Sequence, residues 1–114
     1  MRCGNLIVYT KSYELAVSIY KFTKTLPKEE QYGLTSQLRR ASTSIPLNIA
    51  EGYGKQASTA EFKRYLMMAK GSCCEMGVLL DLLKDLEYLT VEHHKSYYEK
   101  YEEIEKMLYS LIQK

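Results

Sequence analysis

The side chains most able to do chemistry are two adjacent histidines, His93 and His94, and two adjacent cysteines, Cys73 and Cys74. Adjacent helical residues point about 100° apart, so neither pair can turn both members toward one metal ion. No Glu-x-x-His pair and no Cys-x-x-Cys spacing accompanies them. Glu75 near Cys73 lacks the base and the orienting group that an activated nucleophile needs. The sequence therefore predicts no enzyme, no metal site and no cofactor.

Lysine and arginine side chains offer a second chemistry, the binding of phosphate groups. Residues 1–70 hold 11 Lys and Arg against 5 Asp and Glu, whereas residues 71–114 hold 5 against 9. This asymmetry favours an anionic partner or complementary faces in an oligomer, although ordinary solvated faces also explain it. The candidates for contacts to RNA or DNA are Lys11, Lys21, Lys24, Arg39, Lys55, Lys63 and Arg64. The alternative is that these charges only keep the protein soluble.

Length and composition indicate one ordered domain, residues 1–114. Of the 114 residues, 46% are hydrophobic and 26% are charged, with only 6 Gly and 2 Pro, which favours long helices. The apolar runs are far shorter than the ~20 residues that cross a bilayer, and the N-terminus lacks a signal-peptide core. Three cysteines are too few for a disulfide framework. We therefore expect a soluble cytoplasmic protein that binds no membrane and no small-molecule substrate.

Four helices must position these side chains. The apolar spacing predicts helices over about 10–26, ended by Pro27, over 34–53, from a Ser58–Glu61 capping box to about 88, and onward from an N-cap at Thr90. Short connections predict an all-α, antiparallel up-down-up-down four-helix bundle. The residues expected to face inward include Tyr20 and Phe22 in the first helix, Leu34, Leu38, Ala41, Ile45, Ile49 and Gly52 in the second, Met76, Leu83 and Leu86 in the third, and Val91, His94, Tyr98, Tyr101, Ile104 and Leu108 in the fourth.

Two features of the second helix stand out. Pro46 removes a backbone hydrogen bond and should kink the helix there. A polar stripe beside the apolar one consists of Gln37, Arg40, Ser44, Asn48 and Glu51. Short Ser and Asn side chains suit close contact, so we predict that this stripe lies in a bundle or subunit interface, with Arg40 and Glu51 in one hydrogen-bonded network. The alternative is a solvated edge.

The middle of the chain carries a familiar combination of residues. It comprises 37–41 (Gln-Leu-Arg-Arg-Ala), 44–52 (Ser-Ile-Pro-Leu-Asn-Ile-Ala-Glu-Gly), Glu61-Phe62, 69–72 (Ala-Lys-Gly-Ser) and Glu75. Together these resemble the 23S rRNA intervening sequence proteins. The resemblance implies an up-down-up-down bundle in a homopentameric ring, as in the related accessory proteins of diversity-generating retroelements. It also implies binding of RNA or DNA by a basic surface.

Two function hypotheses follow. The first is a homo-oligomeric helical module, pentameric by resemblance, that binds RNA or DNA through its basic surface. The second is a structural protein whose partner is another protein. Eleven tyrosines and no tryptophan fit either hypothesis, because tyrosine suits subunit boundaries as well as cores.

Overall fold

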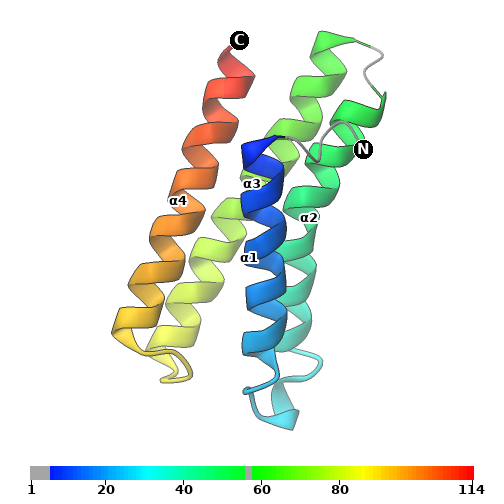
Figure 1. Ribbon diagram of the computed structural model, residues 1–114. Coiled ribbons are helices and arrows are strands. Elements are labelled where there is room, and N and C mark those ends of the chain that lie inside the picture. The colour runs from blue at the N-terminus through cyan, green and yellow to red at the C-terminus, as the bar shows by residue number, and fades with distance from the viewer. Residues whose placement is uncertain (1–5, 56–57) are drawn as a thin grey trace.

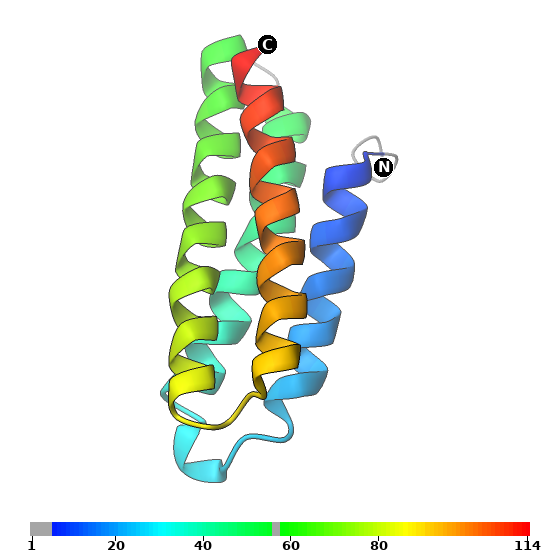
Figure 2. The same cartoon turned by 90° about the vertical axis from the view of Figure 1, so that its left-hand side faces the viewer.

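The computed structural model describes residues 6–55 and 58–114, except for the side chain of Lys55. The described residues form four α-helices, α1 (Ile7–Thr23), α2 (Leu34–Lys55), α3 (Thr59–Asp85) and α4 (Val91–Gln113), and one short 3-10 turn, η2 (Lys28–Glu30). Successive helices lie side by side and run in opposite directions (Figures 1 and 2). This arrangement confirms the predicted all-α, up-and-down architecture. None of the described helices is long and apolar enough to cross a membrane.

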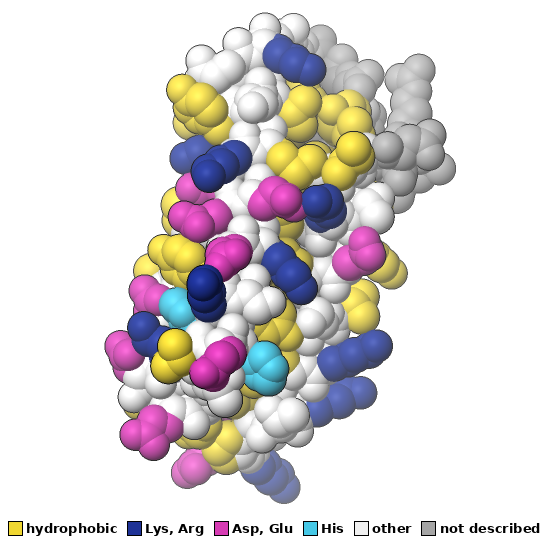
Figure 3. Space-filling model, turned by 60° about the vertical axis from the view of Figure 1, so that its left-hand side comes forward, with side chains coloured by type: hydrophobic (Ala, Val, Ile, Leu, Met, Phe, Trp, Pro, Cys, Tyr) yellow, Lys and Arg dark blue, Asp and Glu magenta, His cyan; other side chains and the backbone are white. Residues whose placement is uncertain are grey.

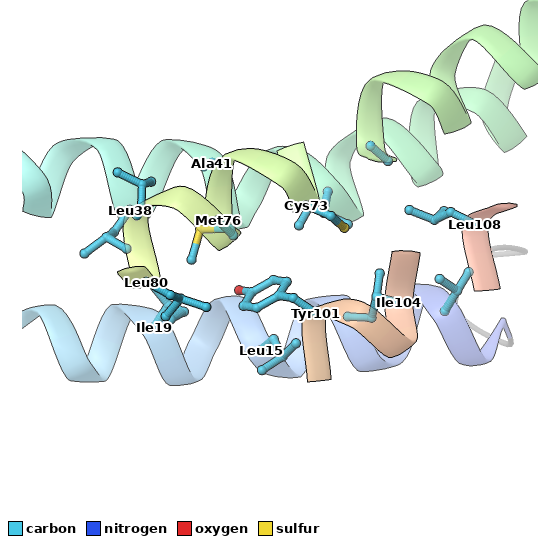
Figure 4. Close-up of a cluster of buried hydrophobic side chains, with 14 of the residues drawn as sticks. Leu15, Ile19, Leu38, Ala41, Cys73, Met76, Leu80, Tyr101, Ile104 and Leu108 are labelled. Carbon is cyan, nitrogen blue, oxygen red and sulfur yellow. The ribbon is translucent and has the colours of Figure 1, made fainter. Parts of the chain in front are cut away.

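The core runs along the centre of the bundle and draws on every helix. Ile19 from α1, Leu38 from α2, Met76 and Leu80 from α3 and Ile104 from α4 are among its fully buried members (Figure 4). All six residues predicted to form the inward stripe of the second helix are buried. Because their spacing follows the 3.6-residue period, one face of α2 meets its neighbours along its whole length.

Gly52 shows how closely α2 and α3 approach. A Cβ atom on Gly52 would lie 3.1 Å from Cβ of Tyr65 and 3.3 Å from the ring of Phe62. Only a residue without a side chain leaves those positions undisturbed. Glycine at this position therefore sets the spacing between the end of α2 and the beginning of α3.

Helix boundaries follow the predicted capping signals at two starts. The Ser58 hydroxyl accepts a hydrogen bond from the backbone N–H of Glu61 at 3.1 Å, and the Thr90 hydroxyl accepts one from the N–H of His93 at 3.1 Å. Both predicted N-caps are confirmed. Helix α2 is continuous in its assigned span through Pro46, which is buried. The kink expected at that residue stays a prediction.

Two helix ends differ from the prediction. Helix α1 begins and ends three residues earlier than expected, because the chain tightens after Thr23 into turns such as Leu26 N–H to the Thr23 carbonyl at 3.1 Å. Pro27 disfavours helical geometry at the residue before it. Helix α3 ends at Asp85 instead of about Tyr88, because Glu87 adopts a left-handed conformation with φ 65°.

Four residues predicted to face inward are exposed. They are Tyr20, Leu86, Val91 and Tyr98. Val91 occupies the first position of α4, beyond the reach of the core, and Leu86 lies past the end of α3. An apolar residue at helical spacing can face either the core or an outer surface, and the period alone does not separate the two.

Candidate interaction surfaces

Several large apolar side chains are exposed on the outer side of α3. Met67, Met68, Val78, Leu82 and Leu86 are exposed there, and we call these residues the α3 outer face. Val78, Leu82 and Leu86 are four residues apart and lie above one another, and Met67 lies on the same side because it precedes Val78 by eleven residues, about three turns. Val78 is 61% exposed and Met67 also 61%, so the bundle itself covers little of either side chain. Exposed apolar side chains gathered on one side of a helix are typical of a contact surface.

Gly71 lies on the same side of α3. Apart from its chain neighbours and the adjacent backbone of its own helix, no described atom lies within 4 Å of the position that a Cβ would occupy at Gly71. The second glycine of α3 differs, because a Cβ on Gly77 would lie 3.6 Å from the ring of Tyr98. A glycine inside a helix costs about 1 kcal/mol relative to alanine. Packing within the chain therefore gives no reason for glycine at residue 71.

Polar bridges join α2 to α3 beside this face. The Arg40 guanidinium forms a 2.6 Å ion pair with Glu75, and the Ser44 hydroxyl donates to the Ser72 hydroxyl at 2.5 Å. The Asn48 amide donates to the carbonyl of Ser44 at 2.8 Å. Two of the five residues of the predicted polar stripe, Arg40 and Ser44, thus bridge the seam between α2 and α3, whereas Asn48 bonds within α2. Sequence reasoning missed the partners, because the rotation of α3 against α2 decides which side chains meet.

Arg40 and Glu51, which we expected in one hydrogen-bonded network, do not pair with each other directly. The two residues are eleven positions apart, about 16 Å along a helix, which is too far for their side chains to meet directly. Arg40 instead pairs across the seam with Glu75. Glu51 is exposed and makes no hydrogen bond or ion pair with another described residue, and Gln37 is exposed as well.

The basic candidates do not gather into one patch. Lys21, Lys24 and Arg39 belong to the end of the bundle where α1 finishes and α2 begins, whereas Lys63 and Arg64 belong to the opposite end, where α3 begins. Lys11 is neutralised by Glu103 of α4 in a 2.6 Å ion pair, and the Lys55 side chain lies outside the described residues.

Contacts within the bundle distinguish the remaining basic residues. Nε of Arg39 donates to the Thr23 hydroxyl at 2.9 Å, and its guanidinium lies 4.6 Å from the centre of the Tyr20 ring. Arg64 lies 5.0 Å from the centre of the Tyr65 ring. Lys21 and Lys24 are exposed and pair with no acidic side chain in the described part of the chain. Their charges are therefore available to an external anion.

A second apolar surface lies on α1. Tyr13, Val17 and Tyr20 are exposed at spacings of four and three residues, and we call them the α1 outer face. Tyr9 extends it, since its ring stacks on that of Tyr13 with centres 6.1 Å apart. The contact of Tyr20 with Arg39 places this face on the side of α1 that borders α2. Tyrosine is enriched at protein interfaces, because it offers a large apolar ring and a hydroxyl.

The outer side of α4 is polar. Its exposed charged residues are Glu92, Lys95, Glu99, Lys100, Glu102, Glu103 and Lys106. Figure 3 shows this side of the molecule, where Lys and Arg side chains are interspersed with Asp and Glu. Mixed charges of this kind are typical of a surface that stays in water.

The surroundings of the two neighbouring cysteines favour the protonated thiol. Burial raises the pKa of the Cys73 thiol to about 12. Desolvation and a 3.5 Å hydrogen bond to Glu105 also raise the pKa of the exposed Cys74 thiol. Because the thiolate is the reactive form, neither shift activates a nucleophile. His94 pairs with Asp81 at 2.8 Å, and within the described ranges no three His, Cys, Asp or Glu side chains lie close enough to hold a metal ion.

The fold and these surfaces together define an all-helical bundle with uncovered apolar faces. Comparison with family models then gives the family: the chain belongs to the 23S rRNA-intervening sequence proteins, whose model matches residues 4–110. The resemblance in the central motif is thereby confirmed.

A solved structure supports this assignment. It is the crystal structure of a protein with unknown function from the S23 ribosomal protein family from Bacteroides thetaiotaomicron VPI-5482. The two chains are 35% identical, and their structures superpose with a TM-score of 0.87 over 95% of this chain and 100% of that one. Comparison with curated proteins gives no match.

Proposed function

We propose that this chain is a non-enzymatic subunit that assembles with copies of itself. The observation that carries this proposal is the α3 outer face, where four large apolar side chains are exposed along the helix and a fifth, Leu86, just past its end. Transfer of apolar surface from water into a contact contributes roughly 25 cal/mol per Å². Methionine adapts to irregular partner surfaces, which suits Met67 and Met68 to such a contact. The homopentameric number follows from the family resemblance.

The second part of the proposal is that the assembly binds RNA or DNA. It is supported by Lys21 and Lys24, which are exposed at one end of the bundle and are not neutralised by a described acidic side chain. Two lysines per subunit give weak binding, but a ring repeats them in every copy. Each phosphate contact then adds to the others through effective concentration and counterion release.

The alternative partner is another protein. The apolar character of the α1 and α3 outer faces favours a protein surface over a phosphate backbone at those two places. Nucleic-acid binding and protein binding differ in their salt dependence, because only neutralisation of phosphates makes the affinity fall steeply with added salt. This difference separates the two partner classes in a single experiment.

Self-assembly is tested by the mass of the native particle, measured by light scattering after gel filtration at micromolar concentration. We expect a mass several times the 13.3 kDa of one chain. A monomeric mass would contradict the proposal.

Nucleic-acid binding is tested by filter binding with single-stranded and double-stranded RNA and DNA at 25–200 mM salt. We expect the affinity to fall as salt rises, and to fall further in the double variant K21E/K24E. The matched control is K95E/K106E on α4, which changes the same charge at another exposed place. If both double variants lose affinity equally, or if the wild type binds nothing at low salt, Lys21 and Lys24 do not form the binding surface.

A further inference from the structure

We propose that the α3 outer face of one copy binds the α1 outer face of the next copy, so that the subunits meet head to tail and close into a ring. This inference rests on the self-assembly proposed above and specifies which surfaces meet. The two faces are separate surfaces on different helices of the same chain.

The position of α2 relates the two faces. Arg39 of α2 contacts Thr23 and Tyr20 of α1, and Arg40 of α2 pairs with Glu75 of α3. Because α2 borders both helices (Figure 1), these contacts indicate that the α1 outer face and the α3 outer face lie on two neighbouring sides of the bundle, with α2 at the edge between them. The polar outer side of α4 is diagonally opposite to that edge.

Symmetry distinguishes a head-to-tail contact from a two-fold one. If the α3 face bound the same face of a second copy, each dimer would leave both α1 faces in water. A heterologous contact covers both faces of every subunit with one type of interface. Because the two faces lie on sides of the bundle that converge at α2, copies joined through them are wedge-shaped, and a heterologous contact of this kind forms a ring when its rotation closes. The wedge shape therefore fits a ring.

Charge supports the same pairing. Helices α1 and α3 run in the same direction, and both finish at the end of the bundle shown at the bottom of Figure 1. At that end the α1 face is bordered by Lys24 and Arg39, and the α3 face by the exposed Asp85 and Glu87. All subunits of a cyclic ring point the same way along its axis. The basic end of one face then meets the acidic end of the other, which favours correct register.

Gly71 fits the same interface. Its missing side chain leaves open space on the α3 side that the ring covers. A helix of the neighbouring copy can therefore approach the α3 backbone more closely at residue 71 than elsewhere along the face. In the ring, the outer side of α2 turns toward the axis, and the charged side of α4 turns toward surrounding water.

The test uses two variants, each with one face destroyed. V78D/L82D removes the α3 face and keeps the α1 face, whereas Y13D/V17D removes the α1 face and keeps the α3 face. All four residues are exposed, so both chains should fold, which circular dichroism and cooperative urea unfolding verify. The matched control S96D/S110D places two aspartates on exposed residues of α4.

We expect each variant alone to be monomeric, the control to keep the wild-type mass, and an equimolar mixture of the two variants to form a 1:1 dimer with twice the mass of one chain. No larger species should appear, because only one intact pair of faces remains. If Y13D/V17D alone forms a dimer, the α3 faces bind each other and the head-to-tail arrangement is wrong. If the wild type assembles but the mixture stays monomeric, the two faces are not partners. A monomeric wild type removes the self-assembly proposal as well.

Discussion

The outer sides of α3 and α4 differ in a way that the fold alone does not require. Both helices are long, with 27 and 23 residues, and both supply one inner face to the same core. The outer side of α4 carries mixed charges, whereas on that of α3 exposed methionine, valine and leucine lie among the charges of Arg64, Glu75 and Asp85. A helix whose outer side faces only water needs charged and polar residues on that side, as α4 has. The comparison therefore separates the residues that fold the chain from those that we assign to its assembly.

The largest expected effect comes from the inner side of α3. Met76 is fully buried, so M76A should destabilise the chain by about 2–5 kcal/mol through lost burial and a residual cavity. The same change at the exposed Met68, M68A, should alter the stability by less than about 0.5 kcal/mol. Urea unfolding in the V78D/L82D background measures both without a contribution from assembly.

The pair M76A and M68A tests whether the outer side of α3 contributes to the stability of the fold. If M68A costs as much as M76A in that background, the outer side of α3 supports the fold itself. The apolar residues there would then need no partner to explain them.

The next largest effect concerns pH and the two neighbouring cysteines. Burial raises the pKa of Cys73 from 9.0 to about 12, so the unfolded chain releases this proton at lower pH than the folded chain does. The stability that the folded chain gains by keeping Cys73 protonated is fully present below pH 9 and is lost as the pH rises toward 12. Above pH 9 the free energy of unfolding should fall by up to about 1.4 kcal/mol per pH unit.

Urea unfolding at pH 8, 9, 10 and 11 measures that slope. C73A should reduce it, whereas C74A on the exposed side of the helix should reduce it less. Ionisation of the buried Tyr101, whose pKa is also raised, adds to the loss above pH 10 in every variant. Equal slopes in C73A and the wild type would show that Cys73 has the same pKa in the folded and the unfolded chain.

Substitutions at Gly71 test whether a neighbouring copy approaches the outer side of α3 closely. In the V78D/L82D background G71A should stabilise the chain by about 1 kcal/mol, since alanine favours the helix and finds open space. In the wild-type background G71L should weaken assembly at least tenfold, because a large side chain blocks the neighbouring copy. Assembly is measured as the native mass over a series of protein dilutions, the dilution profile. S110L on α4 is the control for an added apolar side chain and should leave this profile unchanged. An unaltered profile for G71L would place the contact elsewhere.

Much of the core followed from the sequence, because burial along one helix obeys a simple period. The inward stripe of α2, from Leu34 to Gly52, is buried throughout, and the caps at Ser58 and Thr90 are confirmed. These features depend on neighbours within one helix, which the sequence lists directly.

Other features depend on how helices sit against each other, and here the sequence failed. Tyr20 and Tyr98 have the spacing of core residues, yet the rotation of α1 and α4 leaves both exposed. Arg40 meets Glu75 only because α2 and α3 have a particular register. Surface residues on α3 carry the same period as core residues, so hydrophobicity alone does not reveal which side faces the core.

The smallest expected effect lies at the end of α3, where the chain turns into α4. Glu87 has φ 65°, and the turn is closed by the Tyr88 N–H to the Leu83 carbonyl at 2.9 Å and the Glu87 N–H to the Lys84 carbonyl at 3.0 Å. Glycine adopts this conformation without the Cβ clash, but it also gains entropy in the unfolded chain. E87G should therefore stabilise the chain by up to about 1 kcal/mol in the V78D/L82D background.

Asp85 supplies the matched control for that substitution. It is the last residue of α3, so D85G removes an acidic side chain two positions away at a site where helical geometry gives glycine no advantage. We expect D85G to destabilise the chain by about 0.5–1 kcal/mol while E87G stabilises it, as measured by thermal unfolding at neutral pH. Because both changes remove one negative charge, opposite signs would assign the difference to backbone conformation. Equal shifts in the same direction would instead assign it to charge, and the left-handed turn would then not limit stability at the junction between the two helices.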